Sequence, residues 1–180
     1  MEQEIERRAK EIAQQMKALG RKIEAGDESD LLIWILPGVL ACSHRPLRHH
    51  PLYGGSGRNL AKDATPLLHE WVRRMHQFGI RSILCLMHDK ELSYYSALEL
   101  GARDLLHFYQ NHGFETRRIP WEDPAHSKTG LASIRKTMHI VQLQCLREFR
   151  SMKKPVVLHC SAGRDRSAPV AAYIQMRSMS

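Results

Sequence analysis

The chain has 180 residues, of which 43% are hydrophobic and 26% are charged, and its formal net charge at pH 7 is +8. This composition is ordinary for a soluble globular protein, and the length suits one domain with a hydrophobic core of its own. The longest apolar run, Leu31 to Leu36, is too short to cross a bilayer, and the N-terminus lacks the basic and then apolar pattern of a signal peptide, so we expect no stable membrane insertion.

The positive charge admits two interpretations. It either keeps the protein soluble or attracts polyanions such as phosphoinositides, polyphosphates or nucleic acid. Because the excess of lysine and arginine is spread along the chain, the net charge alone does not decide between the two.

The cysteines lie far apart in the sequence, at Cys42, Cys85, Cys145 and Cys160. This spacing fits neither a disulfide framework nor a zinc site. The pair His49 and His50 has no cysteine or carboxylate at ligand spacing, so we interpret it as part of a loop or of the surface rather than as a metal site. We therefore expect a reducing, cytoplasmic location, no metal and no cofactor.

The first predicted element is an amphipathic helix over residues 2–23. Its apolar residues recur at helical spacing along one side, at Ile5, Ala9, Ile12, Met16 and Leu19. Such a stripe packs on the protein's own core more often than on a membrane, and its acidic neighbours favour the core. We expect residues 1–28 to form an N-terminal helical extension of a main domain over residues 29–180, with a single domain overall.

Strands and helices alternate in the main domain. A strand over residues 31–36 ends at Pro37 and Gly38, a second strand returns over 39–42, and a loop rich in Pro, Gly, Arg and His runs to residue 58. The later predicted elements are a helix over 64–78, a strand over 80–87, a helix over 96–112, a strand over 114–119, a helix from 129 or 130 to 152 and a strand over 156–159. This alternation predicts an α/β fold with a central, mainly parallel sheet flanked by helices, in which ligands bind at the carboxyl ends of the strands.

The most informative stretch joins the last strand to a final helix and reads His-Cys-Ser-Ala-Gly-Arg-Asp-Arg-Ser over residues 159–167. Cys160 precedes Arg166 by six residues, with Gly163 between them and Ser167 directly after. A loop between a strand and a helix turns backbone N–H groups inward to bind an anion, and a helix N-terminus with a nearby arginine favours a reactive thiolate. The loop thus combines a nucleophile, an anion-binding backbone and a guanidinium group.

This stretch resembles the phosphate-binding loop of cysteine-dependent phosphatases, His-Cys-x5-Arg-Ser/Thr. The order of elements over residues 31–173 also resembles the compact dual-specificity branch of that superfamily. The resemblance implies that residues 29–180 form a phosphatase domain that hydrolyses phosphoproteins or phosphoinositides through a phosphocysteine. In that assignment Cys160 is the nucleophile, Arg166 binds the phosphoryl oxygens, Ser167 stabilises the leaving thiolate and His159 sets the loop geometry. The remaining loop residues bind substrate, namely Ser161, Ala162, Gly163, Arg164 and Asp165.

An acid is also needed to protonate the leaving oxygen. In the family an aspartate on an upstream loop does this, and Trp121-Glu122-Asp123-Pro124 resembles that loop with its proline displaced. We predict Asp123 as the acid and keep its neighbours Glu122 and His126 as alternatives.

Three loop and strand residues each leave two interpretations open. Asp165, an acidic residue just before the arginine, as in myotubularin-type lipid phosphatases, either acts as an acid or positions water, or else holds Arg166 or a nearby backbone group in place, and we favour the orienting role. Arg164 either contacts a second phosphate or faces solvent. Cys85 is either a redox partner of Cys160 or, as we favour, a core cysteine. Further basic residues upstream would make the entrance of the site positive, namely His44, Arg45, Arg48, His49, His50 and Arg58.

The chain departs from the family at its C-terminal end, where only a few residues follow the helix after the cysteine loop. Either the chain is truncated or the N-terminal helix covers the surface that further helices cover elsewhere. Three other functions remain open. The charge permits an RNA 5′-triphosphatase, although no aromatic and basic run indicates base stacking. The intact Cys160, Arg166 and Ser167 disfavour a non-catalytic phosphate-binding module, and the trailing Arg-Ser disfavours a sulfur-transfer enzyme.

Overall fold

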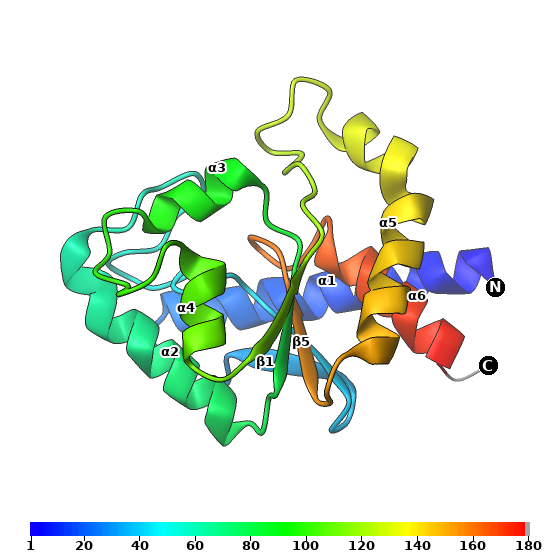
Figure 1. The fold of residues 1–180 in the computed structure, drawn as a ribbon. Coiled ribbons are helices and arrows are strands. Elements are labelled where there is room, and N and C mark those ends of the chain that lie inside the picture. Colours follow the sequence, from blue (N-terminus) through cyan, green and yellow to red (C-terminus); the bar gives the residue numbers. More distant parts are fainter. Residues whose placement is uncertain (179–180) are drawn as a thin grey trace.

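A five-stranded sheet in the order β1-β2-β5-β3-β4 forms the centre of the molecule (Figure 1). The structure is a computed structural model and describes residues 1–178. In chain order its elements are α1 (Glu2–Glu24), β1 (Leu32–Leu36), β2 (Leu40–Ser43), η1 (Lys62–Ala64), α2 (Thr65–Gln77), β3 (Ser82–Cys85), α3 (Asp89–Leu92), η2 (Ser93–Tyr95), α4 (Leu105–Asn111), β4 (Glu115–Arg118), α5 (Leu131–Ser151), β5 (Val156–His159) and α6 (Ser167–Ser178).

The sheet is mainly parallel, as predicted. Only the edge strand β1 is antiparallel, to its neighbour β2, whereas β2, β5, β3 and β4 run in parallel. The carboxyl ends of these four strands therefore lie at one edge of the sheet, and the loops that follow them gather there (Figure 1). The α/β class with a flanked sheet is confirmed, although β3 and β4 are shorter than the predicted strands over 80–87 and 114–119.

Helices cover both faces of the sheet. On β5, Val156 and Leu158 face the core that α1, α5 and α6 complete, whereas Val157 faces the core on the side of α2 and α4. This alternation follows from the two-residue period of a strand. Because both faces are covered, β5 is buried throughout, which explains its continuous apolar run.

The helix predicted over residues 2–23 is confirmed as α1, and its apolar stripe is buried. Ile12 and Met16 are fully buried, and each such side chain contributes about 1.5–3 kcal/mol by leaving water. On the same helix Arg8 Nε donates a 2.8 Å hydrogen bond to Gln175 Oε1 of α6. The N-terminal helix and the helix after the cysteine loop therefore share one core.

The helix predicted over residues 96–112 is wrong in its first half, because α4 begins only at Leu105. Gly101 adopts a left-handed backbone, with φ of 58°, which interrupts the helix. Asp104 then caps the helix, since its Oδ1 accepts a 2.8 Å hydrogen bond from the N–H of His107. The apolar residues before this cap recur at helical spacing but lie in turns.

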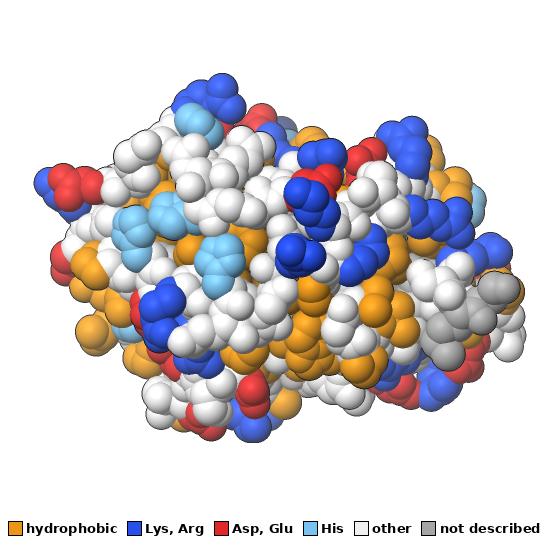
Figure 2. All heavy atoms as spheres, turned by 60° about the horizontal axis from the view of Figure 1, so that its bottom comes forward, with side chains coloured by type: hydrophobic (Ala, Val, Ile, Leu, Met, Phe, Trp, Pro, Cys, Tyr) orange, Lys and Arg blue, Asp and Glu red, His pale blue; other side chains and the backbone are white. Residues whose placement is uncertain are grey.

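The surface is mixed in charge. On the face drawn in Figure 2, lysine and arginine side chains are scattered among neutral and hydrophobic ones, with several histidines grouped on one side. Among the helices within residues 1–178, none is both long enough and apolar enough to span a membrane.

Candidate active site

The carboxyl edge of the sheet carries one pocket that joins three loops. The loop after β2 contributes Arg48 and Ser56, the loop after β4 contributes Asp123 and Ala125, and the loop after β5 contributes the rest. The full lining is Arg48, Ser56, Asp123, Ala125, Cys160, Ser161, Ala162, Arg164, Asp165 and Arg166. The pocket therefore brings together most of the site residues that the sequence predicted.

The cysteine loop fits closely against α1. Gly163 has a φ of +71°, a left-handed conformation that favours glycine. A Cβ atom at this position would lie 2.5 Å from Met16 Cε and 3.2 Å from the carbonyl oxygen of Ser43. Only a glycine fits here without displacing its neighbours, so the close approach of the loop to α1 and to Ser43 requires Gly163.

The backbone of this loop is available for a ligand. Within residues 1–178, none of the N–H groups from Ser161 to Arg166 donates a hydrogen bond to another part of the chain. Cys160 lies at the start of this run, only 2% exposed but in the wall of the pocket. Unpaired N–H groups in succession form an anion-binding nest, and an anion in it would lie against the sulfur.

Arg166 is almost fully buried and is held by carboxylates. Its Nη1 and Nη2 donate bonds of 2.6 and 2.7 Å to the two carboxylate oxygens of Glu91, and Nη1 also donates to the carbonyl of Trp121 at 2.8 Å. Asp123 Oδ2 lies 3.0 Å from Nη2. Burial alone would lower the pKa of Arg166, but the bond to Glu91 and the negative charges of Cys160, Glu91 and Asp123 raise it above its ordinary value.

Sequence reasoning missed Glu91. This residue is 2% exposed, and its Oε2 also accepts a 2.9 Å hydrogen bond from the N–H of His88. Its neighbours His88, Asp89 and Lys90 are exposed, so the segment has the composition of a solvated turn and carries no signal of a buried carboxylate.

The structure does not support Asp165 as the residue that orients Arg166. Its side chain is exposed, and within residues 1–178 it forms no hydrogen bond or ion pair with Arg166. The carboxylates of Glu91 and Asp123 orient the arginine instead. Asp165 and the half-buried Arg164 both line the pocket.

The loop that carries Asp123 is anchored on both sides. Trp121 Nε1 donates a 2.8 Å hydrogen bond to Thr137 Oγ1 of α5. Asp123 Oδ1 accepts a 3.0 Å bond from the N–H of Ala125. The alternative acids Glu122 and His126 are exposed and do not line the pocket, so Asp123 is the carboxylate of this loop that lines the same pocket as Cys160.

His159 and Ser167 flank the loop and are fully buried. His159 donates from Nδ1 to the carbonyl of Cys160 at 3.2 Å, and its Nε2 accepts from Tyr109 Oη at 3.3 Å. Burial, with the charges of Arg166 and Arg45, lowers the pKa of His159 to about 4, so the ring is neutral at pH 7. The hydroxyl of Ser167 has no hydrogen-bond partner within residues 1–178.

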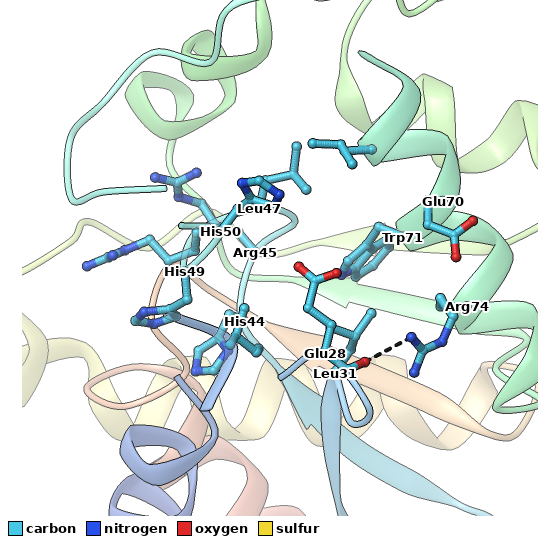
Figure 3. Close-up of a pocket in the computed structure, with 13 residues that line it drawn as sticks. Glu28, Leu31, His44, Arg45, Leu47, His49, His50, Glu70, Trp71 and Arg74 are labelled. Carbon is cyan, nitrogen blue, oxygen red and sulfur yellow. Dashed lines mark hydrogen bonds between the residues drawn. The ribbon is translucent and has the colours of Figure 1, made fainter. Parts of the chain in front are cut away.

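A second hollow lies on the other side of the segment 44–50. Figure 3 shows this segment facing Trp71 and Arg74 of α2, with Glu28 and Leu31 beside them. The dashed line in Figure 3 joins Arg74 Nη1 to the carbonyl of Glu28, at 2.9 Å. This bond ties α2 to the turn before β1, and the hollow lies between α2 and the segment 44–50.

The other cysteines lie in the core. Burial raises the pKa of the Cys85 and Cys145 thiols to about 12 and raises that of Cys42 further. Cys85 is level with His159 on the neighbouring strand, but it packs in the cluster on the side of α2, whereas Cys160 packs on the side of α6. This arrangement favours the interpretation of Cys85 as a core residue.

Within residues 1–178 no group of three or more histidine, cysteine or acidic side chains is arranged to hold a metal ion. Comparison of the sequence with protein-family models and with curated proteins finds no match.

Proposed function

We propose that this protein is a cysteine-dependent phosphatase that hydrolyses phosphate monoesters through a phosphocysteine intermediate. The observation that carries the proposal is one pocket lined by Cys160, Asp123 and Arg166, beside a loop whose N–H groups have no partner within residues 1–178. A nucleophile, an acid and an oxyanion-binding backbone are the groups that this reaction needs.

In the first step the Cys160 thiolate attacks phosphorus and the bond to the leaving oxygen breaks. The loop N–H groups and Arg166 bind the nonbridging oxygens, whose charge redistributes in the transition state. Asp123 donates a proton to the leaving oxygen, so that an alcohol or phenol departs rather than its anion.

In the second step water attacks the phosphocysteine, Asp123 accepts a proton from that water, and the thiolate leaves. The Ser167 hydroxyl is buried next to Arg166 in the chain and has no partner within residues 1–178, so it is available to donate to the departing sulfur. The products are inorganic phosphate and the restored thiolate.

The ion pair between Asp123 and Arg166 bears on the order of events. Asp123 Oδ2 is bonded to Nη2 of Arg166, a group that a phosphoryl oxygen also needs. An incoming phosphate repels the carboxylate and competes for Nη2, so we infer that substrate binding turns Asp123 away from the arginine. The freed carboxylate takes up a proton from solvent, and this is the proton that it donates to the leaving oxygen.

We propose further that the fold belongs to the compact dual-specificity type, with phosphoproteins or phosphoinositides as substrates and a reducing, cytoplasmic location. The support is the antiparallel edge strand β1 beside a parallel sheet, with the cysteine loop between the central strand β5 and α6. A panel of phosphopeptides, phosphoinositides and 5′-triphosphorylated RNA would separate these substrates from the RNA 5′-triphosphatase alternative.

The test compares two cysteine variants. Cys160→Ser should lose turnover of an aryl phosphate and still bind inorganic phosphate, because the loop N–H groups remain. The matched control is Cys145→Ala on α5, which should keep turnover, since Cys145 lies in the core. Turnover that survives in Cys160→Ser, or that a chelator removes from the wild type, would contradict the thiolate mechanism.

A further inference from the structure

The side-chain charges on the Arg166 side of the pocket would not by themselves attract an anion. Arg166 contributes one positive charge, and Glu91 and Asp123 each contribute a negative charge in direct contact with it. With a thiolate at Cys160 this half of the site is net negative. A phosphate dianion needs positive charge from elsewhere.

A second buried arginine lies against the same loop. The backbone N–H of Arg45 donates a 2.9 Å hydrogen bond to the carbonyl of Ser161, the residue after Cys160, and its Nε lies 3.4 Å from Ser161 Oγ. The rest of the guanidinium donates to Tyr95 Oη at 3.3 Å and to the carbonyl of Gly55 at 2.9 Å.

All these acceptors are neutral. Within residues 1–178 no carboxylate lies within ion-pair distance of Arg45, although its side chain is only 1% exposed. Removing a charge from water without a counter-ion costs several kcal/mol even after the protein relaxes. The hydrogen bonds and the adjacent rings of Tyr94 and Tyr95 offset part of this cost but supply no negative charge.

Other positive groups adjoin Arg45 on the pocket side. Arg48 is half-buried in the pocket wall, and its Nε has no partner within residues 1–178. Burial, together with the charges of Arg45 and Arg164, lowers the pKa of Arg48 from its ordinary value. The three arginines therefore act on one another through a shared positive field at the pocket.

We propose that Arg45 is a further anion-binding determinant of this pocket, and that the phosphate bound by the cysteine loop is the counter-ion that Arg45 lacks. Arg45 acts through its positive charge, from a position behind Ser161, rather than by touching the substrate, so it is a positioning residue. Arg48 and Arg164 extend the positive field to the rim. The inference rests on the proposed function only in taking the bound anion to be the phosphate of a substrate.

The test measures binding of inorganic phosphate to protein that carries Cys160→Ser, so that no turnover intervenes. Binding is measured from the rise in the free energy of unfolding when phosphate is added. This rise depends on the phosphate concentration and the dissociation constant, so variants that differ in stability without phosphate can still be compared. Arg45→Gln should weaken phosphate binding by about tenfold or more, because it removes a charge that is poorly screened, whereas Arg45→Lys should stay within about threefold of the parent.

The matched control is Arg58→Gln, which removes the same charge from the same loop at an exposed position outside the pocket lining. If Arg45→Gln binds phosphate as well as Arg58→Gln does, the charge of Arg45 does not reach the ligand and the proposal is wrong. If Arg45→Lys is as weak as Arg45→Gln, the geometry at Ser161 rather than charge decides binding, and the proposal is also wrong.

The proposed function and this inference fail separately. A wild-type protein that never hydrolyses phosphate esters but shows the predicted order of phosphate affinities would overturn the phosphatase and leave the role of Arg45 intact. An active phosphatase in which Arg45→Gln binds phosphate normally would do the opposite.

Discussion

Two buried arginines flank the cysteine loop, and they differ in their partners. Arg166 and Arg45 are each about 1% exposed, and both belong to the surroundings of Cys160. Arg166 is bonded to the carboxylates of Glu91 and Asp123, whereas Arg45 is bonded only to neutral oxygens. The ion pairs fix the orientation of the Arg166 guanidinium. Without a carboxylate partner, the positive charge of Arg45 is left uncompensated.

The difference suggests a division of roles. A bidentate contact with Glu91 leaves Arg166 little freedom, which suits a group that must match the geometry of a transition state. Its charge is largely cancelled at the pocket, so attraction of the anion falls to Arg45 and its neighbours. The variants described next alter the partners of Arg166, the buried His159 on which both arginines act, or a positive group beside Arg45.

The largest expected effect is on catalysis, from Asp123→Asn. For substrates with poor leaving groups it should lower kcat/KM, which reports the first step, by about 10²–10⁴-fold, the usual contribution of a general acid, and it should lower kcat/KM much less for activated aryl phosphates. Because it also removes a negative charge from Arg166, it should tighten the binding of inorganic phosphate. Steady-state kinetics over a series of leaving groups measures the first effect, and phosphate titration measures the second.

Asp165→Asn is the control for this prediction, since Asp165 lines the same pocket without contacting Arg166. If Asp165→Asn shows the leaving-group dependence and Asp123→Asn does not, the acid has been assigned to the wrong aspartate.

The next effect is on stability, from Glu91→Gln. Breaking a buried ion pair by removing one partner typically costs about 3–5 kcal/mol, because the other charge stays buried. Asp123 also contacts Arg166 and so partly compensates its charge. The free energy of unfolding measured in urea should therefore fall by an amount toward the lower end of that range, and turnover should be weaker as well. Glu122→Gln, an exposed carboxylate of the adjoining loop, should lose little. Equal stability of the two variants would mean that Glu91 does not hold Arg166.

A third effect is the pH dependence of stability, to which the buried His159 contributes. Burial and the charges of Arg166 and Arg45 lower the pKa of this histidine. Burial lowers the pKa of His159 to about 4 and that of His44 to about 3, from an ordinary value of 6.5. The unfolded chain therefore takes up these protons at a higher pH than the folded protein does. Stability should be full above about pH 6.5 and fall as the pH drops toward 4, with His159 alone accounting for about 3 kcal/mol.

Thermal or urea unfolding at several pH values measures this slope. In His159→Asn the stability should decline less steeply between pH 6.5 and 4, whatever its level at neutral pH. If the decline of stability with falling pH is the same in His159→Asn as in the wild type, burial of a neutral His159 does not cause it.

The smallest effect concerns substrates with several phosphates. Arg164→Ala should reduce kcat/KM for an inositol polyphosphate about tenfold more than for an aryl phosphate, which corresponds to about 1.4 kcal/mol. The difference should shrink as salt rises, because exposed charges are screened beyond about 8 Å at physiological ionic strength. Arg58→Ala serves as the control outside the pocket lining. Equal losses on both substrates would assign Arg164 to loop support.

The sequence predicted those parts of the site that are local in the chain. Cys160, Gly163 and Arg166 lie in one loop whose flanking strand and helix have clear patterns, so their proximity follows from short connections. Asp123 could be placed at the same edge because it follows a parallel strand. The sheet class followed in the same way from the alternation of elements.

The contacts between distant segments could not be predicted. Glu91 reaches Arg166 from a short helix in an otherwise polar turn, and no pattern in its neighbours marks it as buried. Arg45 was one of several basic residues in a loop, and only its packing under Ser161 separates it from the exposed Arg58. The start of α4 was missed because a capping aspartate and a left-handed glycine outweigh apolar periodicity.

Detection of the phosphocysteine itself would test the thiolate mechanism most directly. Wild-type protein is mixed with an aryl phosphate, quenched in acid during turnover, digested, and its peptides are analysed by mass spectrometry. We expect one phosphoryl group on the peptide that carries Cys160. It should be absent from Cys160→Ser and more abundant in Asp123→Asn, in which the activation of water is slow. Turnover without a phosphoryl group on Cys160, or with one on another residue, would contradict that mechanism.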